Sequence, residues 1–132
     1  GFLAGDQALI TELLAVRKHA GMILPYPIQQ AMIAALNDDV HVAAQRERYR
    51  LRREKLKAAL EGAGFTIDDS EAGLYLWATR GEDSRTALDW FAERGILVAP
   101  GEFYGPKGVR YVRIGLTASD EAIDVAAGRL RA

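Results

Sequence analysis

Hydrophobic residues recur at helical spacing in the first third of the chain, which predicts two short helices. The first would begin after a capping Asp6 and end before Gly21. The second would have Pro27 at its first helical position, where a missing N–H costs no hydrogen bond. The two apolar stripes consist of Leu9, Ile10, Leu13 and Leu14, and of Ile28, Ala31, Met32, Ala35 and Leu36. Each helix therefore has one face that needs a hydrophobic partner.

A longer helix is predicted from about Val40 to Glu61, because no glycine or proline interrupts the chain before Gly62. Its length suits a connector between two domains. We place the domain boundary near Asp38, where polar residues break the preceding apolar stripe. Residues 1–38 would then close one domain, and residues 39–132 would form a second, smaller one.

The remaining pattern alternates short strands with two helices. The expected strands are Phe65 to Ile67, Leu74 to Thr79, Ile96 to Ala99 and Arg110 to Leu116, and the expected helices are Ser84 to Arg94 and Asp120 to Arg131. Each of these helices has a single apolar stripe, so each can cover one face of a sheet. We predict an α/β fold in which the second domain has two layers, with helices covering one side of a small mixed sheet.

The segment VRYVRIGLT places an arginine in the middle of a predicted strand. Strand residues alternate between faces, so Tyr111 and Arg113 would lie opposite the core-facing side chains. The core-facing residues would be Val112, Ile114 and Leu116. A guanidinium in this position suits bidentate capture of a carboxylate or phosphate. A surface arginine or a structural ion pair is the commoner explanation when the strand is considered alone.

Aromatic residues are predicted on the same face of the sheet. In GLYLWAT, Tyr75 and Trp77 fall opposite Leu76 and could form an aromatic wall beside Arg113, although core packing is the commoner reason for such residues. The segment APGEFYGPKG contains three glycines and two prolines. It would form either a shaped loop near a ligand or a plain connection between strands.

Composition and charge narrow the class of protein. The net charge of -1 argues against a general attraction to nucleic acid or acidic membranes, and no apolar run is long enough to span a bilayer. The absence of cysteine excludes thiol chemistry and fits a reducing cytoplasm. The segment QRERYRLRREKLK carries seven basic and two acidic residues, which fits a solvated connector helix better than a nucleic-acid stripe. His19 and His41 lack metal-ligand spacing, so no metal site is expected.

The order of the motifs resembles the class I/II aminotransferases of fold type I, which use pyridoxal 5′-phosphate. The matching segments are ILPYPIQQAMIAAL, GLYLW, VAPGEFYG and YVRIGLT, which together extend over essentially the whole chain. Gly1 resembles the last glycine of the family's SKxxxxxGxRxG segment, which holds the cofactor lysine and a phosphate-binding arginine. The texts RERYRLRREKL, SEAGLYLWATRGED and APGEFYGPKG look closest to actinobacterial N-succinyldiaminopimelate aminotransferases.

The resemblance implies a role for three residues. Arg113 would pair with the α-carboxylate of an amino-acid substrate, Tyr75 would line the site, and Tyr104 would lie in a loop that borders it. No catalytic or cofactor-binding residue is expected in this chain, since a Schiff-base lysine needs a buried setting that depresses its pKa. The lysines present are Lys18, Lys55, Lys57 and Lys107, all in helices or loops with polar or basic neighbours. Residues 1–38 would be the end of the large cofactor-binding domain, and residues 39–132 the small C-terminal domain.

The resemblance also implies the activity of a longer parent protein. That protein would transfer an amino group between N-succinyl-LL-2,6-diaminopimelate and 2-oxoglutarate in lysine and diaminopimelate biosynthesis, while this chain alone would be inactive. Its partners would be amino-acid and 2-oxo-acid substrates and a second copy of itself, with Leu24 to Pro27 near the dimer interface. Two alternatives stay open: another pyridoxal-phosphate enzyme, such as a lyase or a different aminotransferase, and a non-enzymatic α/β binding module.

Overall fold

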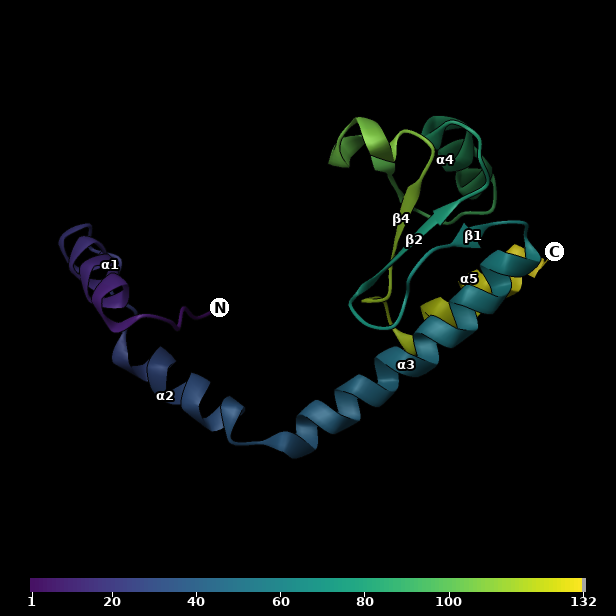
Figure 1. Cartoon of the computed structure of the whole chain (residues 1–132). Helices are drawn as coiled ribbons and strands as arrows, with labels where there is room; N and C mark the ends of the chain where they lie inside the picture. Colours follow the sequence, from purple (N-terminus) through teal and green to yellow (C-terminus); the bar gives the residue numbers. More distant parts are fainter. Residues whose placement is uncertain (132) are drawn as a thin grey trace. The chain divides into compact units, whose positions relative to one another are not determined.

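A computed structural model describes residues 1–131 and divides the chain into two compact units, Gly1–His41 and Val42–Ala132. The first unit contains α1 (Gln7–His19) and α2 (Tyr26–Leu36), and α3 (Asp39–Gly62) begins at its end (Figure 1). The other elements belong to the second unit: β1 (Thr66–Ile67), β2 (Tyr75–Thr79), α4 (Ser84–Glu93), β3 (Ala99–Pro100), η1 (Gly101–Tyr104), η2 (Pro106–Gly108), β4 (Val112–Gly115) and α5 (Asp120–Arg131).

The first unit has well-defined helix ends but no buried side chain among its residues. Asp6 caps α1 as predicted, because its carboxylate accepts the backbone N–H groups of Ala8 and Leu9 at 2.9 and 3.1 Å. The second helix begins one residue earlier than expected, at Tyr26, so that Pro27 is not its first residue. The predicted apolar stripes exist, but their side chains remain exposed or half-buried within this unit.

The four strands of the second unit form one sheet in the order β1-β2-β4-β3. Every pair of neighbouring strands is antiparallel, so the prediction of a mixed sheet was wrong. The predicted strand–helix–strand passage from β2 through α4 to β3 does exist. However, β4 lies between β2 and β3 and runs antiparallel to both of them. Sequence order alone does not show which strand occupies the central position.

The predicted strand from Ile96 to Ala99 is also corrected by the structure. Only Ala99 and Pro100 pair with β4. The backbone N–H of Ile96 instead donates to the carbonyl of Phe91 at 3.0 Å and closes the end of α4. Leu97 then faces solvent, with 95% of its surface exposed. The apolar run that suggested a strand is therefore the exit from a helix.

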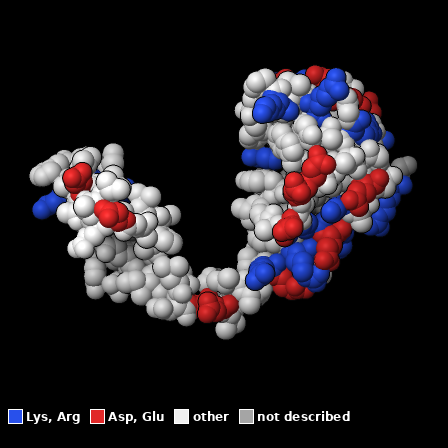
Figure 2. Space-filling view, in the orientation of Figure 1, with Lys and Arg blue, Asp and Glu red and all other residues white. Residues whose placement is uncertain are grey.

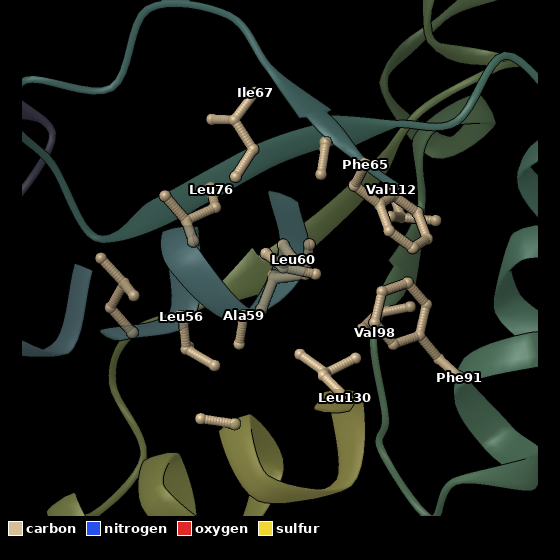
Figure 3. Close-up of a cluster of buried hydrophobic side chains, with 14 of the residues drawn as sticks. Leu56, Ala59, Leu60, Phe65, Ile67, Leu76, Phe91, Val98, Val112 and Leu130 are labelled. Carbon is tan, nitrogen blue, oxygen red and sulfur yellow. The ribbon is translucent and has the colours of Figure 1, made fainter. Parts of the chain in front are cut away.

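The core of the second unit lies between one face of the sheet and the helices α3, α4 and α5 (Figure 3). All three helices and the inward-facing strand positions contribute buried apolar side chains to one cluster. Its members include Leu56 and Leu60 from α3, Ala87 and Phe91 from α4, Ile123, Ala127 and Leu130 from α5, and Leu76, Ala78, Val112 and Ile114 from the sheet. This is the predicted two-layer arrangement, and no α-helix among residues 42–131 covers the opposite face of the sheet, which is called the helix-free face below.

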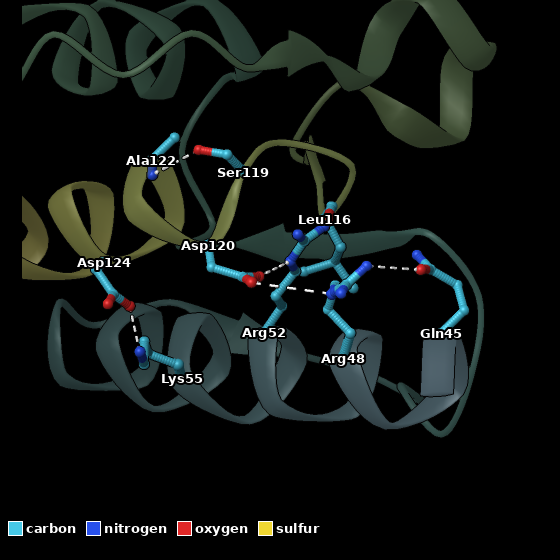
Figure 4. Close-up of polar contacts among 9 residues, drawn as sticks. All are labelled: Gln45, Arg48, Arg52, Lys55, Leu116, Ser119, Asp120, Ala122 and Asp124. Atoms are coloured by element: carbon cyan, nitrogen blue, oxygen red, sulfur yellow. Dashed lines mark hydrogen bonds and ion pairs between the residues drawn. The ribbon is translucent and has the colours of Figure 1, made fainter. Parts of the chain in front are cut away.

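Hydrogen bonds and ion pairs connect α3 to α5 along one side of the second unit (Figure 4). Arg52 bonds the carboxylate of Asp120 at 2.5 Å and the carbonyl of Leu116 at 3.0 Å, and Lys55 pairs with Asp124. Within α3 itself, Arg50 is paired with acidic residues one turn away on either side. Figure 2 shows the resulting mixture of acidic and basic side chains on this unit. None of the helices in residues 1–131 is long and apolar enough to cross a membrane.

Candidate functional site

The helix-free face of the sheet carries Arg113 near its middle. Its strand alternates as predicted, since Val112 and Ile114 are buried in the core and Arg113, between them, is half-buried on the other face. In the sheet register, Arg113 pairs with Trp77 of β2 on one side and with Ala99 of β3 on the other. The guanidinium is thus held by a central strand rather than by a mobile loop.

Two tyrosine rings enclose the guanidinium of Arg113. Its Cζ atom lies 4.3 Å from the ring centre of Tyr75 and 5.0 Å from that of Tyr104. Tyr75 pairs in register with Gly115, two residues beyond Arg113, so it reaches the arginine along the diagonal of the sheet. We call the guanidinium of Arg113 and the two flanking rings of Tyr75 and Tyr104 the cage. The two tyrosines are 46% and 51% exposed, so the cage is open to solvent. Cation–π contacts of this kind restrict a guanidinium without neutralising its charge.

Arg113 has no ionic partner within the part of the chain that the structure describes. No carboxylate among residues 1–131 lies within ion-pair distance, and the Nε atom is buried without a hydrogen-bond partner. The alternative of a structural ion pair therefore does not hold for these residues. A half-buried, unpaired guanidinium is a strong donor for a planar anion, because its N–H groups match the two oxygens of a carboxylate.

A pair of glycines shapes the loop that carries Tyr104. A Cβ atom added to Gly101 would lie 2.2 Å from the Gly108 carbonyl oxygen, and one added to Gly108 would lie 2.1 Å from the Gly101 oxygen. The two backbones can therefore approach only without side chains. The N–H of Gly101 also donates to the carbonyl of Tyr111 at 2.8 Å, which ties the loop to the residue before β4.

Phe103, the other aromatic residue of this loop, lies away from the cage. It is 67% exposed, and its ring contacts the guanidinium of Arg85 at 5.5 Å. Arg85 also pairs with Glu102, so the acidic residue nearest to Tyr104 in the loop already has a basic partner on α4. The structure thus brings Tyr75 and Tyr104 to Arg113, and leaves Phe103 at the outer edge of the loop.

A second layer of aromatic rings supports the cage. Trp77 stacks on Tyr111 with ring centres 5.3 Å apart and an interplanar angle of 11°. Its edge meets the ring of Tyr104 at 5.7 Å and 81°. The strand alternation predicted Trp77 on this face, but it gave no sign that Tyr111 and Tyr104 would meet the same indole. That contact needed the loop to fold back over the sheet.

No lysine of the chain has the surroundings of a cofactor-binding lysine. Lys18, Lys55 and Lys107 are exposed, and Lys57 is half-buried beside Glu61 at 3.9 Å. A Schiff-base lysine requires burial that favours its neutral form, so the lysines present do not fit pyridoxal phosphate. Residues 1–131 also contain no group of three or more His, Cys, Asp or Glu side chains arranged to hold a metal ion.

Fold and sequence place the chain in one protein family. The chain belongs to the aminotransferase class I and II family, whose sequence model matches residues 1–130. It is 61% identical to a probable aminotransferase of Mycobacterium tuberculosis, covering 98% of this chain and 31% of that protein. It is 59% identical to the 4-dedimethylamino-4-oxo-anhydrotetracycline transaminase of Streptomyces rimosus, covering 98% of this chain and 36% of that protein.

Solved structures show the same fold. An aminotransferase from Staphylococcus aureus superposes with a TM-score of 0.83 at 32% identity, covering 97% of this chain and 35% of that one. The N-succinyldiaminopimelate aminotransferase of Mycobacterium tuberculosis gives a TM-score of 0.78 at 28% identity, covering 97% and 36%. The chain thus spans about a third of the length of the proteins it matches.

Proposed function

We propose that this chain is part of a longer pyridoxal-phosphate-dependent aminotransferase, in which Arg113 binds the α-carboxylate of the amino-acid and 2-oxo-acid substrates. The observation that carries the proposal is the guanidinium of Arg113, which lies between Tyr75 and Tyr104 on the helix-free face of the sheet and has no ionic partner among residues 1–131. Membership of the aminotransferase family supports the reaction class.

The residues of this chain contribute binding and orientation. Two parallel N–H···O bonds from Arg113 to a carboxylate fix both the position and the plane of the substrate. Tyr75 and Tyr104 limit the motion of the guanidinium before the substrate arrives, so less conformational freedom is lost on binding. In the full-length protein, pyridoxal phosphate would supply the electron sink for amino transfer. The lysine that holds the cofactor would lie upstream of this chain, so the chain alone would not catalyse the reaction.

For the substrate, we propose N-succinyl-LL-2,6-diaminopimelate with 2-oxoglutarate as the acceptor of the amino group. Support comes from the structural similarity to the N-succinyldiaminopimelate aminotransferase and from 35% identity, over 96% of this chain and 34% of that protein, to the LL-diaminopimelate aminotransferase of Oleidesulfovibrio alaskensis. A second candidate is amino transfer to a bulky cyclic ketone, because the tetracycline transaminase is 59% identical to this chain. Comparing the two acceptors in one coupled assay with the full-length protein separates these candidates.

We also propose that the full-length protein is a homodimer. The first unit has many exposed apolar side chains, which supports the proposal that another protein surface packs against it. Leu24 to Pro27 would lie close to the second subunit. Sedimentation of the full-length protein tests this, and a monomer at micromolar concentration would contradict it.

The first experiment is an absorbance spectrum with added pyridoxal phosphate, recorded for this chain and for a form extended upstream through the expected lysine segment. Only the extended form should keep a cofactor absorbance band after gel filtration, and this band should change when an amino donor is added. Borohydride should attach the cofactor covalently to the extended form alone. An extended form that binds no cofactor would leave the binding-module alternative as the better description. A form that binds cofactor but releases ammonia from its substrate would favour a lyase.

A further inference from the structure

The two tryptophans of the chain have different surroundings although both are half-buried in the second unit. Trp90 lies on α4 against Phe65 and Phe91, beside the hydrophobic core. Trp77 lies on the helix-free face, directly opposite Arg113 in the register of β2 and β4. Only Trp77 is therefore in a position to influence the cage.

Trp77 contacts the Tyr104 loop at two places. The edge of its ring system meets the Tyr104 ring, with centres 5.7 Å apart. Its Cη2 atom would also lie 3.0 Å from a Cβ atom at Gly101, so the first residue of the loop passes directly over the indole. Tyr111 stacks on the same indole and restricts its rotation. The indole therefore supports the loop at its first residue and at Tyr104.

Tyr104 needs such support because it is half exposed and belongs to a short 3-10 helix. Among residues 1–131, its ring has aromatic or cationic contacts only with Trp77 and Arg113. Removal of the indole would let Tyr104 leave the guanidinium, and Arg113 would then sample rotamers that do not face a carboxylate.

We propose that Trp77 is a positioning residue, which holds Tyr104 over Arg113 so that the guanidinium is preoriented for the substrate carboxylate. This inference rests on the proposed role of Arg113. Trp77 itself does not touch the substrate. Its effect should therefore appear only with substrates that carry the carboxylate, and not in cofactor binding.

The test uses the full-length enzyme loaded with cofactor and the variants Trp77→Leu and Trp77→Phe. Trp77→Leu should raise KM for both the amino-acid donor and the 2-oxo-acid acceptor by about three- to thirtyfold, the range expected when a cation–π contact is lost. Trp77→Phe keeps an aromatic edge and should restore most of the affinity. Single-turnover reaction with a simple alkylamine, followed by cofactor absorbance, should proceed at the wild-type rate because this donor has no carboxylate.

Control variants separate positioning from general damage. Trp90→Phe alters the other half-buried tryptophan and should lower the melting temperature while leaving KM unchanged. If Trp77→Leu does not fold, Tyr111→Leu removes the stacking partner of the same indole and should produce the same selective rise in KM. An unchanged KM in the folded variant, or an equal loss with the alkylamine, would overturn the proposal. Arg113→Ala in the same series tests the role of Arg113 on which this inference rests. If Arg113→Ala leaves KM unchanged, the proposed carboxylate site is wrong, even where a Trp77 variant raises KM.

Discussion

At the scale of single residues, the surroundings of Arg113 determine what it can bind. Its guanidinium is half-buried, contacts two aromatic rings and has no carboxylate partner among residues 1–131. Partial burial of a charge has a desolvation cost, which a bound planar anion would offset. This electrostatic requirement, rather than the strand pattern, distinguishes Arg113 from the many arginines on the surface.

Replacing Arg113 tests this directly. In the full-length enzyme, Arg113→Ala should lower kcat/KM for amino-acid donors by about ten- to a hundredfold or more, the value of a charged hydrogen bond or two. Arg113→Lys should restore only part of the loss, because a lysine cannot form the bidentate pair. The cofactor spectrum should not change. Steady-state kinetics with wild-type rates in both variants would exclude the carboxylate role.

The close pair of glycines gives a second prediction at this scale. Gly108→Ala places a methyl group against the backbone of Gly101 and should lower the stability of the full-length protein by about 1–3 kcal/mol, as overpacking does elsewhere. Gly128→Ala is the matched control, since an added methyl in the last turn of α5 would have no atom within 4 Å apart from its chain neighbours and the adjacent backbone of its own helix. It should raise stability by about 0.5–1 kcal/mol through helix propensity. Thermal unfolding should show a lower melting temperature for Gly108→Ala and a higher one for Gly128→Ala.

At the scale of elements, the contact between α3 and α5 depends on one arginine more than on the surrounding ion pairs. The side chain of Arg52 is only 11% exposed and donates to both the Asp120 carboxylate and the Leu116 carbonyl. Lys55 pairs with Asp124 at a position where both side chains are about half exposed. Water and salt screen the second pair far more than the first.

We therefore expect Arg52→Ala to destabilise the protein by about 1–3 kcal/mol, because it leaves a backbone carbonyl without its partner. Lys55→Ala should cost at most about 1 kcal/mol. Urea unfolding at low and high salt checks both values, and only the smaller Lys55 effect should vanish at high salt. Equal effects of the two substitutions would show that the degree of burial does not matter here.

The start of α3 should respond to acid. The Asp38 carboxylate accepts the backbone N–H groups of Val40 and His41 at 3.0 and 3.3 Å, and the hydrogen bond from His41 holds the pKa of Asp38 below its usual value. The cap is therefore fully effective above the unfolded pKa of about 3.9 and is lost as the pH falls through the lower folded value. NMR shifts of the Val40 and His41 amides should report this loss. Asp38→Asn keeps a capping oxygen and should remove the part of this pH dependence that comes from protonation of the Asp38 carboxylate.

At the scale of the whole molecule, the two units differ in how completely they bury their apolar side chains. The second unit has a continuous core, whereas residues 1–41 bury none of theirs. A groove of about 730 Å³ in the first unit is lined mainly by apolar residues of α1 and of the turn after it, including Leu13, Leu14, Met22, Ile23 and Leu24. Helices without tertiary packing are marginal in water at these lengths.

Hydrogen exchange should reveal this difference. In the isolated chain, amides of α1 and α2 should exchange within seconds, while amides of β2, β4 and the buried turns of α3 remain protected for much longer. In the proposed full-length protein, α1 and α2 should become protected, because the rest of that protein would supply apolar partners for them. Equal protection of both units in the isolated chain would show that the first unit is stable without further packing.

The sequence was most informative where a local rule decides the structure. Hydrophobic periodicity located α1, α2, α4, α5 and the central strands, and it assigned Val112 and Arg113 to opposite faces. Helix-capping and helix-breaking residues located the Asp6 cap and the extent of α3. Ordering the strands was not possible in this way. The central place of β4 and the short β3 depend on contacts between segments far apart in sequence. The run after α4 was misread for a different reason: a local hydrogen bond from Ile96 to Phe91 closes the helix where the apolar residues suggested a strand.

By itself, the sequence determined the helices, the central strands and the faces of their side chains, because these depend on local spacing. Through the order of its motifs it also determined the aminotransferase family, because that depends on residue identity. Only the tertiary structure decided that Tyr75 and Tyr104 enclose Arg113, that Trp77 supports the loop, and that no carboxylate among residues 1–131 neutralises the guanidinium. The contacts of Tyr104 with Arg113 and Trp77 depend on the loop that the close approach of Gly101 and Gly108 shapes. Such long-range packing cannot be inferred from a periodic pattern, since it depends on the volumes and charges that meet once the chain has folded.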